Sequence, residues 1–108
     1  MTDTVTIPRE EYDAMRSRLE DLDDIIAAHE AKTGVTLPHE FAMRIIEGEH
    51  PLRVWRDYRG LTMAALAEEA NVSKTYLSEI ETGKKPGSVD AYKAVAQVLS
   101  VPMDAIIP

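Results

Sequence analysis

The sequence predicts an all-α protein, because apolar residues recur at helical spacing along most of the chain. Between Tyr12 and Ile26 the spacing alternates between three and four residues. The stretch from Leu61 to Gly83 has the pattern of two short helices joined by a tight turn. A further helical pattern covers Val89 to Leu99. We therefore expect a helical N-terminal region over residues 1–50 and a helical domain over residues 51–108.

The first predicted helix follows Pro8, which suits the first helical turn, and ends near Lys32, with Gly34 just beyond. Acidic residues occupy most of its outer faces. Its apolar positions form a heptad seam: Tyr12, Met15, Leu19, Leu22 and Ile26. This seam could fold back on the domain, pair with a second copy, or lie in the groove of a basic partner.

Two short helices are expected next. One covers Pro38 to Glu47, and the other is opened by Pro51 and ended by Gly60. In the second of them Leu52 and Trp55 have the spacing of residues that face a core.

The stretch LTMAALAEEANVSKTYLSEIETG has the parts of a helix-turn-helix in order. Asn71 stands at the joint, where a residue that tolerates positive φ is needed. Ser73 offers a hydroxyl to cap a second helix that begins with Lys74. In a helix-turn-helix that second helix enters the DNA major groove. An ordinary helical hairpin shares this periodicity, but the fixed spacing of several positions favours the DNA-binding motif.

After a turn-rich linker, TGKKPGS, the helix over Val89 to Leu99 is expected to complete the core. Pro102 then opens a final short helix whose Ile106 closes it.

Composition limits the class of protein. The chain has 108 residues, a net charge of −7 and no cysteine, so neither disulfides nor thiolate zinc sites can form. No apolar run is long enough to cross a bilayer, and the N-terminus lacks a secretion signal. We expect a cytoplasmic protein.

The acidity is confined to the first half of the chain. Residues 1–50 hold five basic and 12 acidic side chains, whereas residues 51–108 hold seven of each. Lys74, Lys84 and Lys85 cluster around the second helix of the motif. A neutral domain can still bind DNA when its basic residues share one face.

The residues from Pro51 to Ile106 resemble the XRE family of Cro/C1-type helix-turn-helix domains, which have five helices. The segments that carry the resemblance are Arg56, LAEEANVS, YLSEIETGK and AQVLSVPMDAI. Two positions depart from the family pattern: Asn71 replaces the usual turn glycine, and Met63 replaces a glutamine that often contacts the DNA backbone.

The resemblance implies DNA contacts. It places Lys74, Thr75 and Glu79 at base-reading positions. It also implies phosphate contacts from Ser73, Tyr76, Thr82, Lys84 and Lys85. Glu79 could instead pair with a nearby lysine, and Lys84 and Lys85 could be solvated turn residues. Arg56 and Glu81 match family positions that form an ion pair behind the recognition helix.

The whole layout is similar to HigA-like antitoxins of type II toxin–antitoxin pairs, and IPREEYDAMRSRLEDLDDI resembles toxin-binding segments. This resemblance implies a homodimer that represses its own operon at operator DNA and neutralises a small basic RelE/ParE-type toxin. The alternative is a stand-alone or phage-type XRE regulator without a toxin.

Catalysis is not expected. His29, His39 and His50 are too scattered to form a helical metal-ligand pair, and no nucleophile elbow or glycine-rich phosphate loop is present. We therefore expect no metal and no cofactor.

Overall fold

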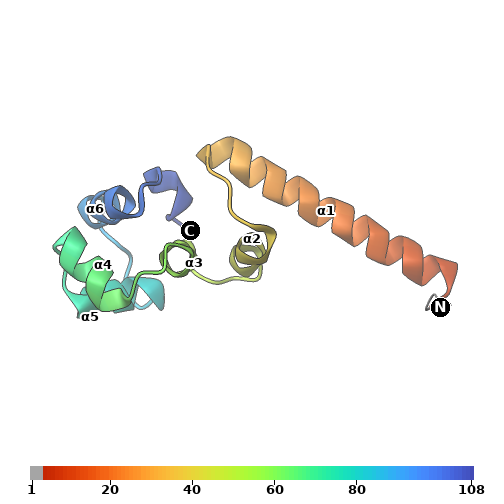
Figure 1. Ribbon diagram of the computed structural model, residues 1–108, viewed down its shortest axis with the longest axis horizontal. Helices are drawn as coiled ribbons and strands as arrows, with labels where there is room; N and C mark the ends of the chain where they lie inside the picture. The colour runs from red at the N-terminus through yellow and green to blue at the C-terminus, as the bar shows by residue number, and fades with distance from the viewer. Residues whose placement is uncertain (1–3) are drawn as a thin grey trace. The chain divides into compact units, whose positions relative to one another are not determined.

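The computed structural model describes residues 4–108, and within them it contains only helices and connecting segments (Figure 1). The six α-helices and one 3-10 helix are α1 (Arg9–Thr33), α2 (His39–Ile46), α3 (Pro51–Tyr58), α4 (Met63–Ala70), α5 (Lys74–Glu81), α6 (Val89–Leu99) and η1 (Met103–Ala105). The expected all-α fold is confirmed. Over residues 4–108, no helix combines the length and the apolar character that crossing a membrane requires.

The chain divides into two compact units, and the second unit begins at Thr33. The boundary expected from the sequence lies at residue 51 instead. The difference concerns α2, which packs against α3. The rings of Phe41 and Tyr58 lie 5.2 Å apart, and Arg44 Nη2 lies 2.7 Å from carboxylates of both Glu49 and Asp57. A helix of eight residues cannot bury an apolar face by itself, so α2 joins the larger unit.

The first unit consists mainly of α1, which Figure 1 shows as one unbroken helix. Glu10 and Glu11 occupy its first turn and Lys32 its last turn, so both ends complement the helix dipole. Gly34 follows with φ of 73°, a conformation that glycine adopts without steric cost.

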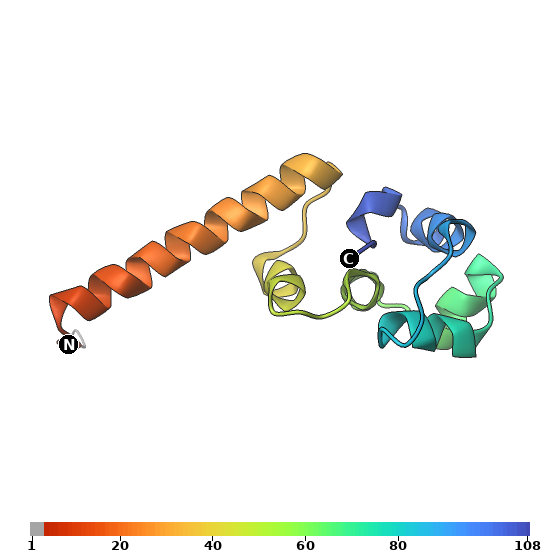
Figure 2. The same ribbon diagram turned by 180° about the vertical axis from the view of Figure 1, so that it is seen from behind.

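The core of the second unit is formed by α3 to α6 and η1. Helix α4 packs against both α5 and α6 (Figures 1 and 2). The largest fully buried side chains are Trp55, Leu52, Leu66, Leu77, Ile80, Leu99 and Ile106. Leu52 and Trp55 therefore face the core, as their spacing predicts.

Local caps begin each helix of this unit from α3 onward, apart from η1. The hydroxyls of Thr62, Ser73 and Ser88 accept hydrogen bonds from backbone N–H groups of α4, α5 and α6, at 3.0–3.1 Å. His50 caps α3, because its Nδ1 accepts from the Leu52 N–H at 3.1 Å. Each such cap stabilises a helix by about 1 kcal/mol.

Candidate nucleic-acid interface

The turn between α4 and α5 sets the direction of the second helix. Asn71 adopts a left-handed conformation with φ of 56° and ψ of 42°. This reversal allows the Val72 N–H to donate to the Ala67 carbonyl at 3.0 Å. The Ser73 hydroxyl then accepts from the Tyr76 N–H, so only three residues separate the end of α4 from the start of α5.

Helix α5 has one buried face and one polar face. Leu77 and Ile80 are almost completely buried in the core. Lys74 and Thr75 are exposed, and Ser78 and Glu79 are partly exposed. The buried face holds the helix rigidly while the polar side chains remain accessible.

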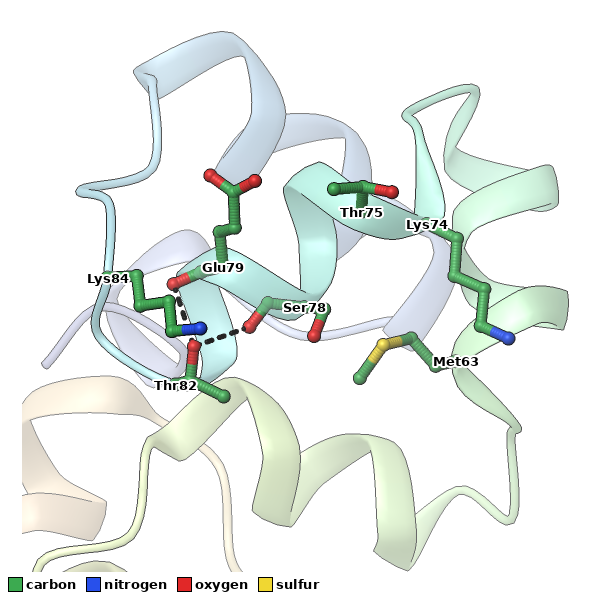
Figure 3. A pocket seen from close by; sticks show the side chains of 7 residues that line it. All are labelled: Met63, Lys74, Thr75, Ser78, Glu79, Thr82 and Lys84. Carbon is green, nitrogen blue, oxygen red and sulfur yellow. Dashed lines mark hydrogen bonds between the residues drawn. The ribbon is translucent and has the colours of Figure 1, made fainter.

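A shallow hollow lies along the polar face of α5 (Figure 3). Its lining comes from the start of α4, from α5 and from the turn after α5: Met63, Lys74, Thr75, Ser78, Glu79, Thr82 and Lys84. Lys74 and Lys84 lie at opposite ends of the hollow in Figure 3, with Ser78 between them. Six of these residues are polar or charged, so the surface is suited to a polar, anionic ligand.

Ser78 is the one polar lining residue that the sequence patterns did not single out. It stands four residues after Lys74 and three after Thr75, and residues at these separations share one face of a helix. Helical periodicity applied to the two selected residues would have identified it. Met63 also lines the hollow, in the place where the family often has a glutamine.

Glu79 is held by the turn that follows α5. Its Oε2 lies 2.9 Å from Lys85 Nζ, and this hydrogen-bonded pairing raises the pKa of Lys85. The backbone N–H groups of Lys84 and Lys85 also donate to the Glu79 carbonyl, at 2.9 and 3.2 Å. Glu79 thus has the lysine partner that was expected as the alternative to base reading.

Two of the residues selected for phosphate contact lie on another surface. Ser73 and Tyr76 line a second hollow between the motif and α6. The Tyr76 hydroxyl accepts a hydrogen bond from the Ser88 N–H at 3.0 Å. Hydrogen bonding to the side chain and then to the backbone of Ser88 lowers the pKa of Tyr76. The structure therefore brings together Lys74, Thr75, Thr82 and Lys84, but not Ser73 and Tyr76, along the hollow of Figure 3.

Thr82 has a structural role at the end of α5. Its hydroxyl donates to the Ser78 carbonyl at 2.9 Å and lies 3.4 Å from the Glu79 carbonyl, as the dashed lines in Figure 3 mark. These contacts add to the backbone hydrogen bonds that the same two carbonyl groups accept at the end of α5.

Arg56 and Glu81, the two residues that the family resemblance pairs, connect α3 to the end of α5. Arg56 Nε donates to Glu81 Oε1 at 2.8 Å, and Arg56 Nη1 donates to the Leu61 carbonyl at 2.9 Å. The side chains are only 13% and 3% exposed, respectively. Such a buried, multiply bonded pair ties α3, the loop before α4 and α5 into one body.

His50 and Tyr92 form a second connection within this unit. The Tyr92 hydroxyl lies 3.3 Å from His50 Nε2. Because His50 Nδ1 accepts from the Leu52 N–H, the proton of the neutral ring resides on Nε2 and is donated to Tyr92. Burial lowers the pKa of His50 and raises that of Tyr92.

Residues 50–106 match the model of a family described as a helix-turn-helix domain, and this match covers just over half of the chain. The chain belongs to this helix-turn-helix family. No solved structure was found to match it.

The chain is also similar to two known proteins, each over a stretch of nearly the same length as the family match. The chain is 38% identical over 56 residues to the immunity repressor protein of Bacillus phage phi105. The matched stretch covers 52% of this chain and 39% of that protein. It is 36% identical over 56 residues to the transcriptional regulator ClgR of Mycobacterium tuberculosis. This match covers 52% of this chain and 50% of that protein. The matched region thus spans half or less of each relative.

Proposed function

We propose that this protein is a sequence-specific transcriptional regulator that binds double-stranded DNA through α5. The observation that carries the proposal is the polar, lysine-flanked face of a helix whose other face is fixed in the core. Such a helix can enter the major groove without losing core contacts. The similarity to a phage immunity repressor and to ClgR supports regulation of transcription.

The chemistry of the hollow suggests a role for each side chain. Lys74 can donate to the O6 and N7 atoms of guanine, and the hydroxyls of Thr75 and Ser78 can bond to several base edges. Lys84, at the far end of the hollow, suits a phosphate. Glu79 can accept from cytosine N4 only if its carboxylate leaves Lys85, so we expect its contribution to sequence preference to be small.

We further propose that two copies bind a palindromic operator. Helix-turn-helix dimers read half-sites separated by about one helical turn, roughly 10 bp, or a multiple of it. A single hollow with two lysines offers few phosphate contacts, and a second copy doubles them.

The decisive experiment titrates the protein with DNA from upstream of its own gene. Lys84→Ala leaves the pair of Lys85 and Glu79 in place. It should weaken binding to all sequences alike and flatten the dependence of affinity on salt, because phosphate contacts release counterions. Thr75→Ala or Ser78→Ala should instead change the preference between sequences. Lys93→Ala is the matched control, because Lys93 is an exposed lysine that does not line the hollow. Unchanged affinity in both the lysine and hydroxyl variants would refute the assigned face.

The finer function that we propose is that of an antitoxin that neutralises a small basic toxin of the RelE/ParE type. The supporting observation is the first half of the chain, which carries a net charge of −7 and a helix with exposed apolar residues. An acidic surface attracts a basic partner and speeds encounter. We assign the toxin contact to the acidic outer face of α1, whose residues include Asp13, Glu20, Asp21 and Asp24.

Co-expression with the product of the adjacent gene tests this function. If that product is a small basic protein that arrests growth, the present chain should rescue growth and co-purify with it. Replacing Asp21 and Asp24 by Asn should slow the association, and high salt should have the same effect. If the neighbouring gene encodes no such protein, the stand-alone phage-type regulator is the remaining function.

A further inference from the structure

Three of the five apolar seam residues of α1 are exposed to an extent that no residue of the second unit's core approaches, and the other two, Leu22 and Ile26, are partly exposed. Tyr12, Met15 and Leu19 are 50%, 48% and 61% exposed, and Ile25 beside the seam is 51% exposed. By contrast, Leu66 and Leu77 in the second unit are completely buried. Several apolar side chains in a row on one helix face are typical of an interaction surface.

The spacing of the seam determines which residues can meet in a two-helix coil. Tyr12, Leu19 and Ile26 occupy the first core position of successive heptads, and Met15, Leu22 and His29 occupy the fourth. In a parallel pair each residue would meet its own copy, so His29 would face His29 of the partner subunit. In an antiparallel pair first and fourth positions alternate, and Leu19 meets Leu22 of the partner subunit.

The charged residues that flank the seam distinguish the two orientations. On one side stand Arg9, Arg16, Asp23 and Glu30, and on the other stand Glu11, Arg18, Ile25 and Lys32. Parallel pairing matches Glu11 with the partner's Arg16 and Arg18 with the partner's Asp23, but leaves Arg9 and Lys32 without opposite charges. Antiparallel pairing uses both ends of the helix, matching Arg9 with the partner's Glu30, Glu11 with the partner's Lys32 and Arg16 with the partner's Asp23.

We propose that α1 pairs with α1 of a second copy of this chain as an antiparallel two-stranded coiled coil. Its layers are Tyr12 against the partner's His29, Met15 against the partner's Ile26, and Leu19 against the partner's Leu22, each repeated by the twofold axis. The flanking ion pairs set the orientation, because e and g charges decide how helices align. Opposed helix dipoles favour the same arrangement.

The arginines that join this coil make only weak contacts within α1. Arg9 lies 3.9 Å from Asp13 and Arg16 lies 3.4 Å from Glu20, and all four side chains are at least 62% exposed. Such surface pairs contribute little to stability, so pairing with the partner costs little.

The antiparallel coil also suits a two-half-site operator, and in this respect the inference rests on the proposed function. With 25 residues in α1, the two Thr33 residues lie about 37 Å apart along the coil. Half-sites one helical turn apart are separated by about 34–36 Å. The two points at which the chains leave the coil would therefore be about as far apart as adjacent major grooves.

Cysteine cross-linking tests the orientation directly, because the natural chain contains no cysteine. Met15→Cys and Ile26→Cys chains are purified separately, mixed and oxidised without DNA. The antiparallel coil places these two positions in one layer, so a disulfide should join unlike chains. Met15→Cys alone should not cross-link, since its copies lie about 16 Å apart along the coil, beyond disulfide reach. Cross-linking of Met15→Cys alone would overturn the orientation.

Charge reversal gives a second, independent test by sedimentation of the full chain. Arg16→Glu should shift the protein toward monomer, and Arg16→Glu combined with Asp23→Arg should restore the dimer. In a parallel coil the double variant would instead set the glutamate introduced at position 16 beside the partner's Glu11 and could not recover. A wild-type chain that stays monomeric at every concentration would overturn the proposal altogether and leave the seam to a different protein.

Failure of the coil and failure of DNA binding remain distinguishable. The cross-linking and sedimentation measurements contain no DNA, and Lys84→Ala should dimerise as the wild type does. Normal dimers that bind no operator would refute the proposed function and leave the coil intact. Monomers that still bind half-site DNA would refute the coil and leave the function intact.

Discussion

Helices α1 and α5 both present polar residues to solvent, but they differ in what lies behind those residues. In α5 the apolar residues Leu77 and Ile80 are buried, and only the polar face is accessible. In α1 the apolar residues Tyr12 and Leu19 are themselves half or more exposed. The apolar face of α5 is therefore buried within the monomer, whereas α1 keeps exposed apolar residues that a second copy would cover in the proposed coil. From this comparison we infer two modes of binding: α5 would bind through polar groups on a rigid support, and α1 would bind through apolar burial guided by charge.

The Arg56–Glu81 pair gives the largest expected effect, because it makes α5 rigid and has no counterpart in α1. Removing one partner of a buried pair leaves the other charge stranded, which costs about 3–5 kcal/mol. Arg56→Ala should lower the free energy of unfolding by this amount in urea titrations monitored by Trp55 fluorescence. Arg53→Ala is the matched control, since it removes an exposed arginine from the same helix. Equal small shifts in both variants would mean that the buried pair does not hold the motif together.

The same substitution in the two helices compares them directly. Leu77→Ala removes a completely buried side chain and should cost about 2–5 kcal/mol of stability. Leu19→Ala with Leu22→Ala should leave the unfolding of the second unit nearly unchanged and instead dissociate the dimer and weaken operator binding. Denaturant melts beside sedimentation of each variant measure both quantities. If the double variant unfolds like Leu77→Ala, the seam is part of the monomer's own core.

The smallest expected effect is a pH dependence located in the second unit. Burial lowers the pKa of His50 below its value of about 6.5 in the unfolded chain. Between these two values the unfolded state binds more protons, so this contribution is fully present above about pH 6.5 and is lost as the pH falls toward the folded-state pKa. Protonation of Nδ1 would also end its bond from the Leu52 N–H.

His50→Asn isolates this effect, because Asn can still cap α3 but does not titrate. Urea melts at neutral pH and at about pH 5 should show a smaller loss of stability in this variant than in the wild type. The charged group that opposes the shift is Glu81, which raises the pKa of His50. An identical loss in both proteins would place the acid sensitivity elsewhere.

Much of the candidate site could be predicted because its signals are local. Asn71 at the turn, Ser73 at the helix start and the spacing of Leu77 and Ile80 all act within a few residues. Ser78 was missed although the same periodicity includes it. The sequence alone did not decide whether Glu79 pairs with Lys85, because this pairing depends on how the turn after α5 folds back.

The sequence by itself determined the positions of the helices, because periodicity, caps and turn residues are properties of neighbouring residues. Val89–Leu99 and the helix that begins at Pro51 have the predicted starting residues. Tertiary structure alone decided that α2 belongs to the second unit, that His50 donates to Tyr92, and that Tyr76 bonds to Ser88 away from the lysines. These contacts join residues distant in sequence, and their free energy arises from burial and hydrogen bonding that no local pattern encodes.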